Sequence, residues 1–560
     1  MEKKIERLVN TEGGSLDLVG GLYLLTVEGS WKQLGFRHAQ LVKHITGDIP
    51  GRYYYSLLKT VIQHALHGPT SGLRARIIST LLREIFYLVN KSKTRGGLLI
   101  ELEALFAGLK IPARYAGRLL QFPDILHYLA GKFTSSAPGC SAIFLQKEKT
   151  LSGGSMLARN FDFFGVRVWD EFQAVKRFFP DDAQAYLWVG PLGLPIGGFG
   201  LNASGIAVMP FTLFTRDCGV KGTPMFVVLN RVLREAETLE QALSILESEK
   251  LTGSYSLMVT DMAAGDGRII GVGRKHREIL EPTSSVLLRT NHQLTEEGRK
   301  LERLPQPWQR HSCSRYTRLE EFLKKTRGRV TMESLCTLLA SGRDSAEERD
   351  ALIGGNLPAV NNALSVAMDW MGDRLAVGCG SFPVSRRGCY EVFSIQKLFH
   401  KKLKYLGALK VDVGLQEEEV EAINLYGAAW HAWFDRMDGG RALRLLRDGG
   451  AMAPAEPAFP RMSGLLHLKF RDWDWAVRDL KRAFRLESEA GRRKAETGLW
   501  LGRALESAGC REEALEIYDE VIALDPEGRF GEAAYAAGKK PWSRGSSHRI
   551  TVDLVTATAE

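Results

Sequence analysis

The sequence predicts an α+β protein with three successive parts: a mostly helical N-terminal segment, a β-rich block and an all-α C-terminal region. Three observations support this prediction. Apolar residues recur at helical spacing over much of residues 1–139. From residue 140 the pattern changes to short runs of β-forming residues, separated by glycine and other turn residues. After about residue 415 the helical spacing returns.

The N-terminal segment, residues 1–139, begins with a predicted hairpin over SLDLVGGLYLLTVEGSW and continues as helices. The predicted helices cover residues 31–49, 74–93, 96–110 and 114–133. The basic first residues precede a short, glycine-broken apolar run, which lacks the features of a signal peptide. The sequence contains no run of about 18 apolar residues, so we expect a cytoplasmic protein without a transmembrane segment.

The β-rich block covers residues 140–410. Runs typical of strands cover residues 140–146, 152–163, 185–190, 197–210, 254–262, 267–273 and 285–292. Two helices are predicted within residues 222–249, and a last strand pair within residues 363–380. This order of elements favours an α+β or layered α/β/α domain.

The C-terminal region, residues 411–538, contains two segments that align at an offset of 38 residues. The aligned residues are Gly464, Ala476, Leu480 and Ala483 in the first segment and Gly502, Ala514, Tyr518 and Val521 in the second. Small residues at these intervals let two helices pack closely, and the pattern resembles the tetratricopeptide (TPR) repeat. Such repeats typically bind a protein partner in a concave groove. The tail, residues 539–560, is rich in Gly, Ser, Arg and Thr and is expected to be disordered.

Charge and cysteine usage argue against two further classes of protein. The formal net charge is +10, but most basic residues lie opposite acidic residues on predicted helical faces, so we expect no nucleic-acid partner. The seven cysteines are scattered and form no CxxC pair, and the histidines show no spacing typical of a metal site. We therefore expect no disulfide framework, no metal and no other cofactor.

The dipeptide Gly139-Cys140 bears most directly on function. Cys140 follows Pro-Gly and opens an apolar run, which is compatible with a buried core cysteine. Alternatively, the chain is cut between the two residues. The new α-amino group, with a pKa of about 7.7–8.0, would then serve as the base for a thiol whose own pKa is about 8.5. A cysteine inside the chain would need a histidine partner, and no local signature indicates one.

The surrounding motifs resemble a known family. GCSAIF followed by ARNFDF looks like the N-terminal-nucleophile (Ntn) cysteine hydrolases of the acyl-CoA:6-aminopenicillanate acyltransferase (peptidase C45) and choloylglycine hydrolase type. GLNASGIAV, RTNHQ and SRYTRL follow in the family's order, so the resemblance covers roughly residues 15–400. It implies that residues 140–410 form the catalytic domain, a four-layer αββα sandwich of antiparallel sheets, and that the chain cleaves itself between Gly139 and Cys140. The long helical propiece favours the acyltransferase branch, whereas the TPR-like region belongs to neither branch.

The resemblance, together with the chemistry, gives a set of candidate catalytic residues. They are Cys140, Arg159, Asp162, Asn202, Asn291 and Arg315. The Cys140 sulfur would attack an amide or thioester carbonyl, with its own α-amine as proton carrier. Asp162 would orient that amine, and Arg159 would favour the ionised thiol. Asn202 and Asn291 would donate hydrogen bonds to the oxyanion, and Arg315 would hold the site or a substrate carboxylate.

Each candidate also has a purely structural interpretation. Arg159 and Asp162 are compatible with an ion pair at a strand end, and Asn202 with a turn in NASG. Asn291 is compatible with a helix cap, and Arg315 with an ordinary position at the start of an amphipathic helix.

The leading hypothesis is a self-processing thiol acyltransferase or amidohydrolase that acts on a small-molecule acyl amide or acyl thioester. Aromatic residues near the second motif are compatible with an apolar acyl pocket or with the core. They are Phe161, Phe163, Phe164, Trp169 and Phe172. The alternative is a catalytically silent hydrolase fold that serves as a TPR-type interaction scaffold.

Overall fold

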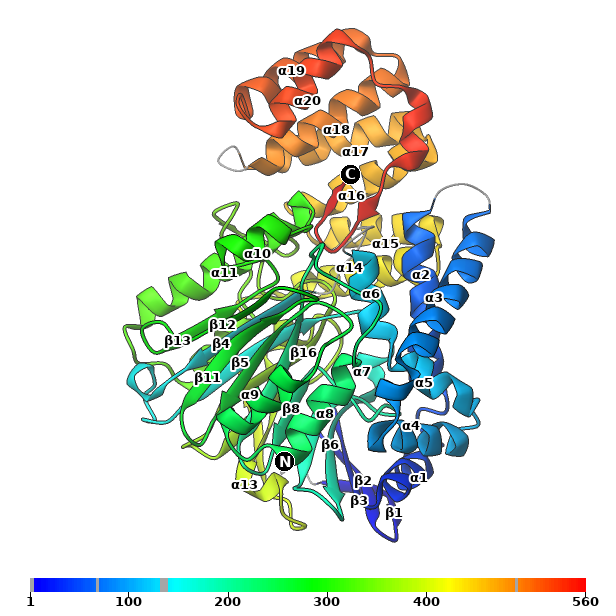
Figure 1. Ribbon diagram of the computed structural model, residues 1–560. Helices are drawn as coiled ribbons and strands as arrows, with labels where there is room; N and C mark the ends of the chain where they lie inside the picture. The colour runs from blue at the N-terminus through cyan, green and yellow to red at the C-terminus, as the bar shows by residue number, and fades with distance from the viewer. Residues whose placement is uncertain (1–4, 67–69, 131–138, 489–491) are drawn as a thin grey trace.

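The computed structural model describes residues 5–66, 70–130, 139–488 and 492–560. Two large sheets are stacked face to face in the lower part of Figure 1, and a helical region lies above them. The segment around Pro138, where the sequence predicts a turn, lies outside the described residues.

The first sheet has ten strands, in the order β1-β2-β3-β6-β7-β8-β9-β10-β11-β12. Their bounds are β1 (Glu6–Thr11), β2 (Gly14–Val19), β3 (Leu22–Gly29), β6 (Gln173–Pro180), β7 (Tyr186–Pro191), β8 (Phe199–Asn202), β9 (Ile206–Thr212), β10 (Tyr255–Asp261), β11 (Asp266–Val272) and β12 (Arg277–Leu280). Neighbouring strands are antiparallel except for the parallel pair β3 and β6. The predicted hairpin is confirmed as β2 and β3, and it extends this sheet.

The second sheet has seven strands, in the order β13-β4-β5-β16-β17-β18-β19. Their bounds are β13 (Val286–Arg289), β4 (Gly139–Leu145), β5 (Met156–Asp162), β16 (Asn362–Asp369), β17 (Arg374–Gly378), β18 (Cys389–Phe393) and β19 (Tyr405–Lys410). β4 faces β9 of the first sheet, and β13 faces β11. Every residue of β4 is buried, as expected for a strand that is covered on both faces.

Helices cover the outer face of each sheet. α8 (Met225–Glu235) and α9 (Leu239–Ser248) pack on the first sheet, and α11 (Gln306–Thr326) and α12 (Met332–Leu339) pack on the second. The layers therefore follow the order helix, sheet, sheet, helix. Shorter elements connect them: η2 (Lys147–Lys149), α7 (Trp169–Phe172), α10 (Glu296–Leu301), β14 (Arg343–Asp344), β15 (Arg349–Asp350), η3 (Val384–Arg387) and α13 (Ile395–Leu398).

The residues before Cys140 are part of this fold and consist of three strands followed by helices. Besides β1–β3 they form α1 (Trp31–Val42), α2 (Ile49–Ala65), α3 (Ser71–Thr94), α4 (Gly97–Gly108), η1 (Ala113–Tyr115), α5 (Ala116–Leu119) and α6 (Phe122–Ala130). Through the pairing of β3 with β6, the first sheet contains strands from both sides of the predicted cleavage point.

The C-terminal region consists of helices, as predicted. They are α14 (Glu417–Phe434), α15 (Gly439–Met452), α16 (Ala458–Phe470), α17 (Trp473–Leu486), α18 (Arg492–Ala508), α19 (Arg511–Leu524) and α20 (Arg529–Lys539) (Figure 1). The aligned glycines lie where neighbouring helices pack closely, Gly464 against Leu480 and Gly502 against Tyr518. Assignment of these helices to the TPR class stays a prediction. In the described ranges, no helix has the length and apolar character needed to cross a membrane.

The prediction of a disordered tail is wrong. Residues 539–560 contain η4 (Arg544–Arg549) and a small hairpin of β20 (Val552–Asp553) and β21 (Thr558–Ala559). Val552, Leu554 and Val555 are buried. Tyr426 and Trp433 of α14 donate side-chain hydrogen bonds to the carbonyls of Leu554 and Val552. The few apolar residues of the tail are enough to hold it, although its composition resembles that of a disordered segment.

The close approach of α18 and α19 leads to a stability prediction. A Cβ atom at Gly502 would lie 2.3 Å from Tyr518 Cε1, so Gly502→Ala should lower the free energy of unfolding by about 1–3 kcal/mol. Gly538 in α20 is a matched control, because its Cβ would meet no atom within 4 Å. Gly538→Ala should raise stability by about 0.5–1 kcal/mol. Urea unfolding measures both changes, and equal effects of the two substitutions would contradict the packing described.

Candidate active site

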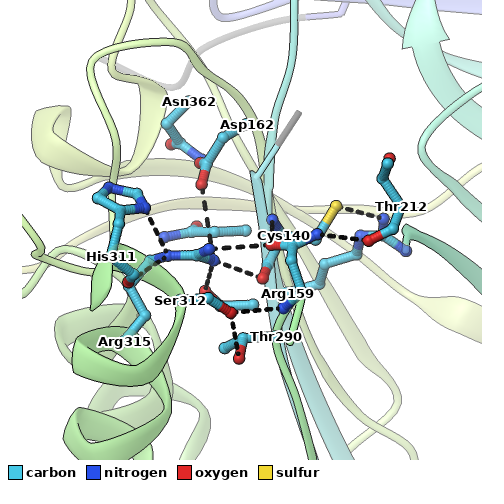
Figure 2. Close-up of polar contacts among 12 residues, drawn as sticks. Cys140, Arg159, Asp162, Thr212, Thr290, His311, Ser312, Arg315 and Asn362 are labelled. Carbon is cyan, nitrogen blue, oxygen red and sulfur yellow. Dashed lines mark hydrogen bonds and ion pairs between the residues drawn. The ribbon is translucent and has the colours of Figure 1, made fainter. Parts of the chain in front are cut away.

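Cys140 is the second residue of β4 and is completely buried. In the register of β4 and β5, Gly139 lies opposite Asp162 and Cys140 lies opposite Phe161. The strand pairing therefore brings the predicted cleavage point and the Arg-Asn-Phe-Asp motif together. Figure 2 shows the polar contacts around Cys140.

Asn291 binds the backbone nitrogen of Cys140. Its Oδ1 accepts hydrogen bonds from Cys140 N at 2.8 Å and from Arg315 Nη2 at 2.9 Å. Its Nδ2 donates to the carbonyl oxygen of Thr212 at 3.2 Å. Its own backbone N–H donates to Ser312 Oγ at 2.8 Å, so the side chain is held on several sides. An acceptor in this place would also accept a hydrogen bond from an α-amino group formed at Cys140.

Arg159 lies beside the sulfur. Its Nη2 is 3.5 Å from Cys140 Sγ and donates to the carbonyl oxygen of Pro210 at 2.5 Å. Its guanidinium also packs on the rings of Phe161 and Phe211. Burial raises the pKa of the Cys140 thiol above its ordinary value, and the positive charge of Arg159 opposes that rise. The buried thiol therefore needs a nearby base to become a nucleophile.

Arg315, on α11, connects the other groups. Its Nη1 donates to the carbonyl oxygen of Cys140 and to Ser141 Oγ, the latter at 2.8 Å. The same nitrogen is 4.0 Å from Asp162 Oδ2. Its Nε donates to His311, one helical turn earlier. Arg315 is completely buried, so its position is fixed by these contacts.

Asp162 lies at the end of β5, beside Gly139. Its Oδ1 accepts a hydrogen bond from Asn362 Nδ2 at 2.9 Å. A Cβ atom on Gly139 would lie only 2.8 Å from Asp162 Oδ2, which explains the glycine at this position. Burial raises the pKa of Asp162 from 3.8 to about 6, while the charge of Arg315 and the hydrogen bond from Asn362 oppose the rise.

Asn202 is not brought to this site, which corrects its predicted role. Its Oδ1 accepts from Ile206 N at 2.9 Å, and its Nδ2 donates to the carbonyl oxygens of Leu233 and Ala236 at 3.1 and 2.7 Å. These contacts fit the turn interpretation. Pro210, next to the sulfur, is four residues beyond Ile206 on β9, a distance of roughly 13 Å along a strand.

Two residues that support the site, Ser312 and Asn362, lie outside the sequence motifs. Ser312 Oγ accepts the backbone N–H groups of Asn291 and His292 and donates to Thr290 Oγ1. A signal for Ser312 was present, because it precedes Arg315 by three residues and so shares its helical face. Asn362, which orients Asp162, comes from β16 and has no sequence signal near the motif.

An apolar pocket borders the site through Phe161 and Pro210. It holds about 730 Å³ of empty space, part of which is open to solvent. Of the five aromatic residues singled out in the sequence, three line it: Phe161, Phe163 and Trp169. Phe164 and Phe172 lie in the core. Other lining residues come from α6, α8 and the loop after β7: Phe122, Leu126, His127, Leu194, Ile196, Met225 and Phe226.

Comparison with known proteins gives one family match. Residues 150–342, about a third of the chain, match the family model of acyl-coenzyme A:6-aminopenicillanic acid acyl-transferase. The matched segment begins after Cys140 and contains Arg159, Asp162, Asn291 and Arg315. No curated protein matches the chain.

Among solved structures, similar chains include two hydrolases. A Caenorhabditis elegans N-acylethanolamine-hydrolyzing acid amidase ortholog is 13% identical, with a TM-score of 0.30; the alignment covers 41% of this chain and 92% of that one. A variant of conjugated bile acid hydrolase from Clostridium perfringens is 12% identical, with a TM-score of 0.31 and coverage of 50% and 99%. Structural similarity at TM-scores this low does not support a functional assignment. The proposed function therefore depends on the site geometry and the family match.

Proposed function

We propose that this protein is a self-processing thiol acyltransferase or amidohydrolase that works through an acyl-Cys140 intermediate. One observation carries the proposal: three predicted site residues contact three different atoms of Cys140. Asn291 accepts from its nitrogen, Arg315 donates to its carbonyl oxygen, and Arg159 approaches its sulfur. Any buried residue needs partners for its backbone N–H and C=O, but at Cys140 polar side chains supply them, and a core cysteine would not also need a buried guanidinium beside its sulfur.

The first reaction in this proposal is cleavage of the chain. Cys140 Sγ attacks the carbonyl carbon of Gly139, and the Gly139–Cys140 C–N bond breaks as the acyl group moves from nitrogen to sulfur. Water then hydrolyses the resulting thioester, which leaves a carboxylate on Gly139 and both a free thiol and an α-amine on Cys140. Asp162, beside Gly139 and with a raised pKa of about 6, is placed to assist proton transfer.

The second reaction is acyl transfer. The α-amine of Cys140 takes the thiol proton, sulfur attacks the acyl carbon, and the amine returns the proton to the leaving group. Asn291 Oδ1 would hold the amine, and the second N–H of Asn291 Nδ2 is proposed to donate to the oxyanion. Water or another nucleophile then releases the acyl group from Cys140.

The apolar pocket supports a substrate with an apolar acyl group. Its walls come from both sides of the cleavage point, because α6 precedes Cys140 and α8 follows it. The N-terminal fragment is therefore proposed to remain bound after cleavage as part of the substrate site.

Mass analysis of the purified full-length chain tests the proposal. We expect two fragments, one that ends at Gly139 and one that begins at Cys140, and the second should form a thiazolidine with an aldehyde. A catalytically active chain that stays intact would refute self-processing. Cleaved protein that neither labels with an aldehyde nor hydrolyses acyl-amide probes would instead favour the scaffold alternative.

The raised pKa of Asp162 predicts a specific pH dependence of cleavage. In the uncut chain Cys140 N is an amide, so it does not titrate. Below a pH of about 6 the Asp162 carboxylate becomes protonated, whereas an ordinary aspartate would stay ionised down to about pH 4. As the pH is lowered, the cleavage rate of chain made by cell-free synthesis should therefore fall more steeply below pH 6 than above pH 6. Asp162→Asn should abolish this change in slope; an unchanged profile would exclude the proposed role.

A change in the pocket wall should alter substrate preference. Leu126 lines the pocket from α6, and Leu126→Phe should occupy part of the space for the acyl group. We expect the ratio of kcat/KM for long and short acyl amides to fall by about tenfold, because each methylene in an apolar pocket is worth 1–3 kcal/mol. Leu129→Phe, on the same helix but outside the pocket lining, is the matched control. A parallel loss for both chain lengths would contradict an acyl-binding role.

A further inference from the structure

Three side chains with metal-binding atoms lie together far from Cys140. Cys379 follows β17, and Cys389 and Glu391 are the first and third residues of β18, so both point to the same face of that strand. Cys379 N donates to the carbonyl oxygen of Cys389 at 3.0 Å, which places the two cysteines opposite each other. The two Sγ atoms and a carboxylate oxygen of Glu391 all lie within 4.8 Å of one another.

The surroundings of Glu391 are shaped to hold its carboxylate near the thiols. Glu391 is completely buried, and Cys379 Sγ is 3.8 Å from its Oε1. The other oxygen, Oε2, accepts a hydrogen bond from the hydroxyl of Tyr405 on β19. Gly20, in the β2–β3 turn at φ +62°, leaves the room for Oε1, because a Cβ there would lie 1.8 Å from it.

We propose that Cys379, Cys389 and Glu391 bind a zinc ion. Two thiolates and one carboxylate are typical zinc ligands, and a water molecule would complete the tetrahedron. Separations of up to 4.8 Å between ligand atoms need only small side-chain movements to reach Zn–S distances of about 2.3 Å and Zn–O distances of about 2.0–2.2 Å. On binding, both thiols release their protons to solvent. Tyr405 orients the carboxylate, as outer-shell partners of metal ligands commonly do. This proposal differs from the sequence-based expectation of no metal.

The ion would be structural and separate from the reaction. β18 is four strands away from β4 in the second sheet, roughly 19 Å at about 4.8 Å per strand. Its ligands close the loop between β17 and β18, which carries Ser385. Ser385 Oγ donates to Asn362 Oδ1 at 3.0 Å, and Asn362 in turn donates to Asp162. Zinc would thus hold the loop that supports Asp162; only this consequence depends on the proposed function.

Zinc content of the full-length chain is the primary test. After incubation with zinc and removal of the unbound ion, elemental analysis should find one zinc per chain. Cys379→Ser and Cys389→Ser should each lose it, while Cys510→Ser, at an exposed cysteine elsewhere, should keep it. Cobalt should bind in place of zinc and give the thiolate charge-transfer absorption that the two cysteine variants lack.

A milder variant separates loss of zinc affinity from misfolding of the chain. Tyr405→Phe removes only the hydroxyl that contacts Glu391, and it should weaken zinc affinity by about 10–100-fold in a chelator competition. Zinc binding that is equal in wild type and in both folded cysteine variants would overturn the proposal. A Cys379–Cys389 disulfide that persists under reducing conditions would overturn it as well. Because zinc content is measured without substrate, failure here is distinguishable from failure of the proposed enzymatic activity.

Discussion

Alanine at position 140 is expected to leave the chain uncut and to abolish turnover of acyl amides. The substitution removes the sulfur that is proposed to attack Gly139 in the first reaction and the substrate in the second. Loss of the nucleophile in other covalent hydrolases lowers kcat by about 10⁶-fold, and we expect a loss of that order here. Because Cys140 is buried among well-packed neighbours, alanine should leave the fold intact at a moderate cost in stability. Denaturing electrophoresis and hydrolysis of acyl-amide probes measure the two effects.

Cys313→Ala is the matched control for this variant. Cys313 is a half-buried cysteine on α11, two residues from Arg315, and the pKa of its thiol is also raised by burial. This variant should be cleaved normally and should keep its activity. Normal cleavage of the Cys140→Ala chain would refute the proposed nucleophile, and loss of cleavage in both variants would point to a disturbed fold.

Arg315→Lys is expected to slow cleavage and turnover by about 10²-fold or more, although the positive charge is kept. A guanidinium can donate in several fixed directions, and that of Arg315 contacts the carbonyl oxygen of Cys140, Ser141 Oγ and Asn291 Oδ1 together. An ammonium group cannot keep this planar set of contacts. Displacement of reacting groups by about 1 Å is enough for a loss of 10²-fold.

Arg318→Lys supplies the comparison for Arg315. Arg318 lies one turn further along α11, where its Nε donates to Ser341 Oγ, away from Cys140. It should leave the cleavage rate within about twofold of the wild type. The time course of fragment appearance measures both rates. Equal rates for the two lysine variants would show that Arg315 provides charge rather than geometry.

The sequence was most informative where apolar runs are covered on both faces. β4, β5, β9 and β10 are entirely or almost entirely buried; the predicted runs contain β5 and β10 and overlap β4 and β9. β6 was not predicted as a strand because its centre carries Lys176 and Arg177, residue types that are typical of solvent-exposed positions. Both are buried: Lys176 Nζ donates to three backbone carbonyls at the end of β7 and in the loop after it, and Arg177 donates to Thr26. Such pairing depends on contacts far along the chain, which local patterns do not contain.

The same distinction applies to the site. Arg159 and Asp162 were predictable because they belong to one short motif that the family resemblance identifies, and the register of β4 and β5 brings this motif to Cys140. Asn202 was misplaced because a turn motif and an active-site asparagine look alike in sequence, and only the partners of its amide separate them. The anchoring of α11 could not be predicted at all. Arg310, five residues before Arg315 on α11, forms an ion pair with Glu496 of the helical region at 2.5 Å.

The parallel pairing of β3 with β6 has a thermodynamic consequence. Once the Gly139–Cys140 bond is broken, one sheet is built from two separate molecules, and unfolding becomes a dissociation. The measured midpoint of thermal unfolding should then rise with protein concentration, as mass action requires for a heterodimer, whereas that of an uncut variant should not. The severed protein would also refold by a second-order encounter of its two pieces, so dilution alone would slow its recovery.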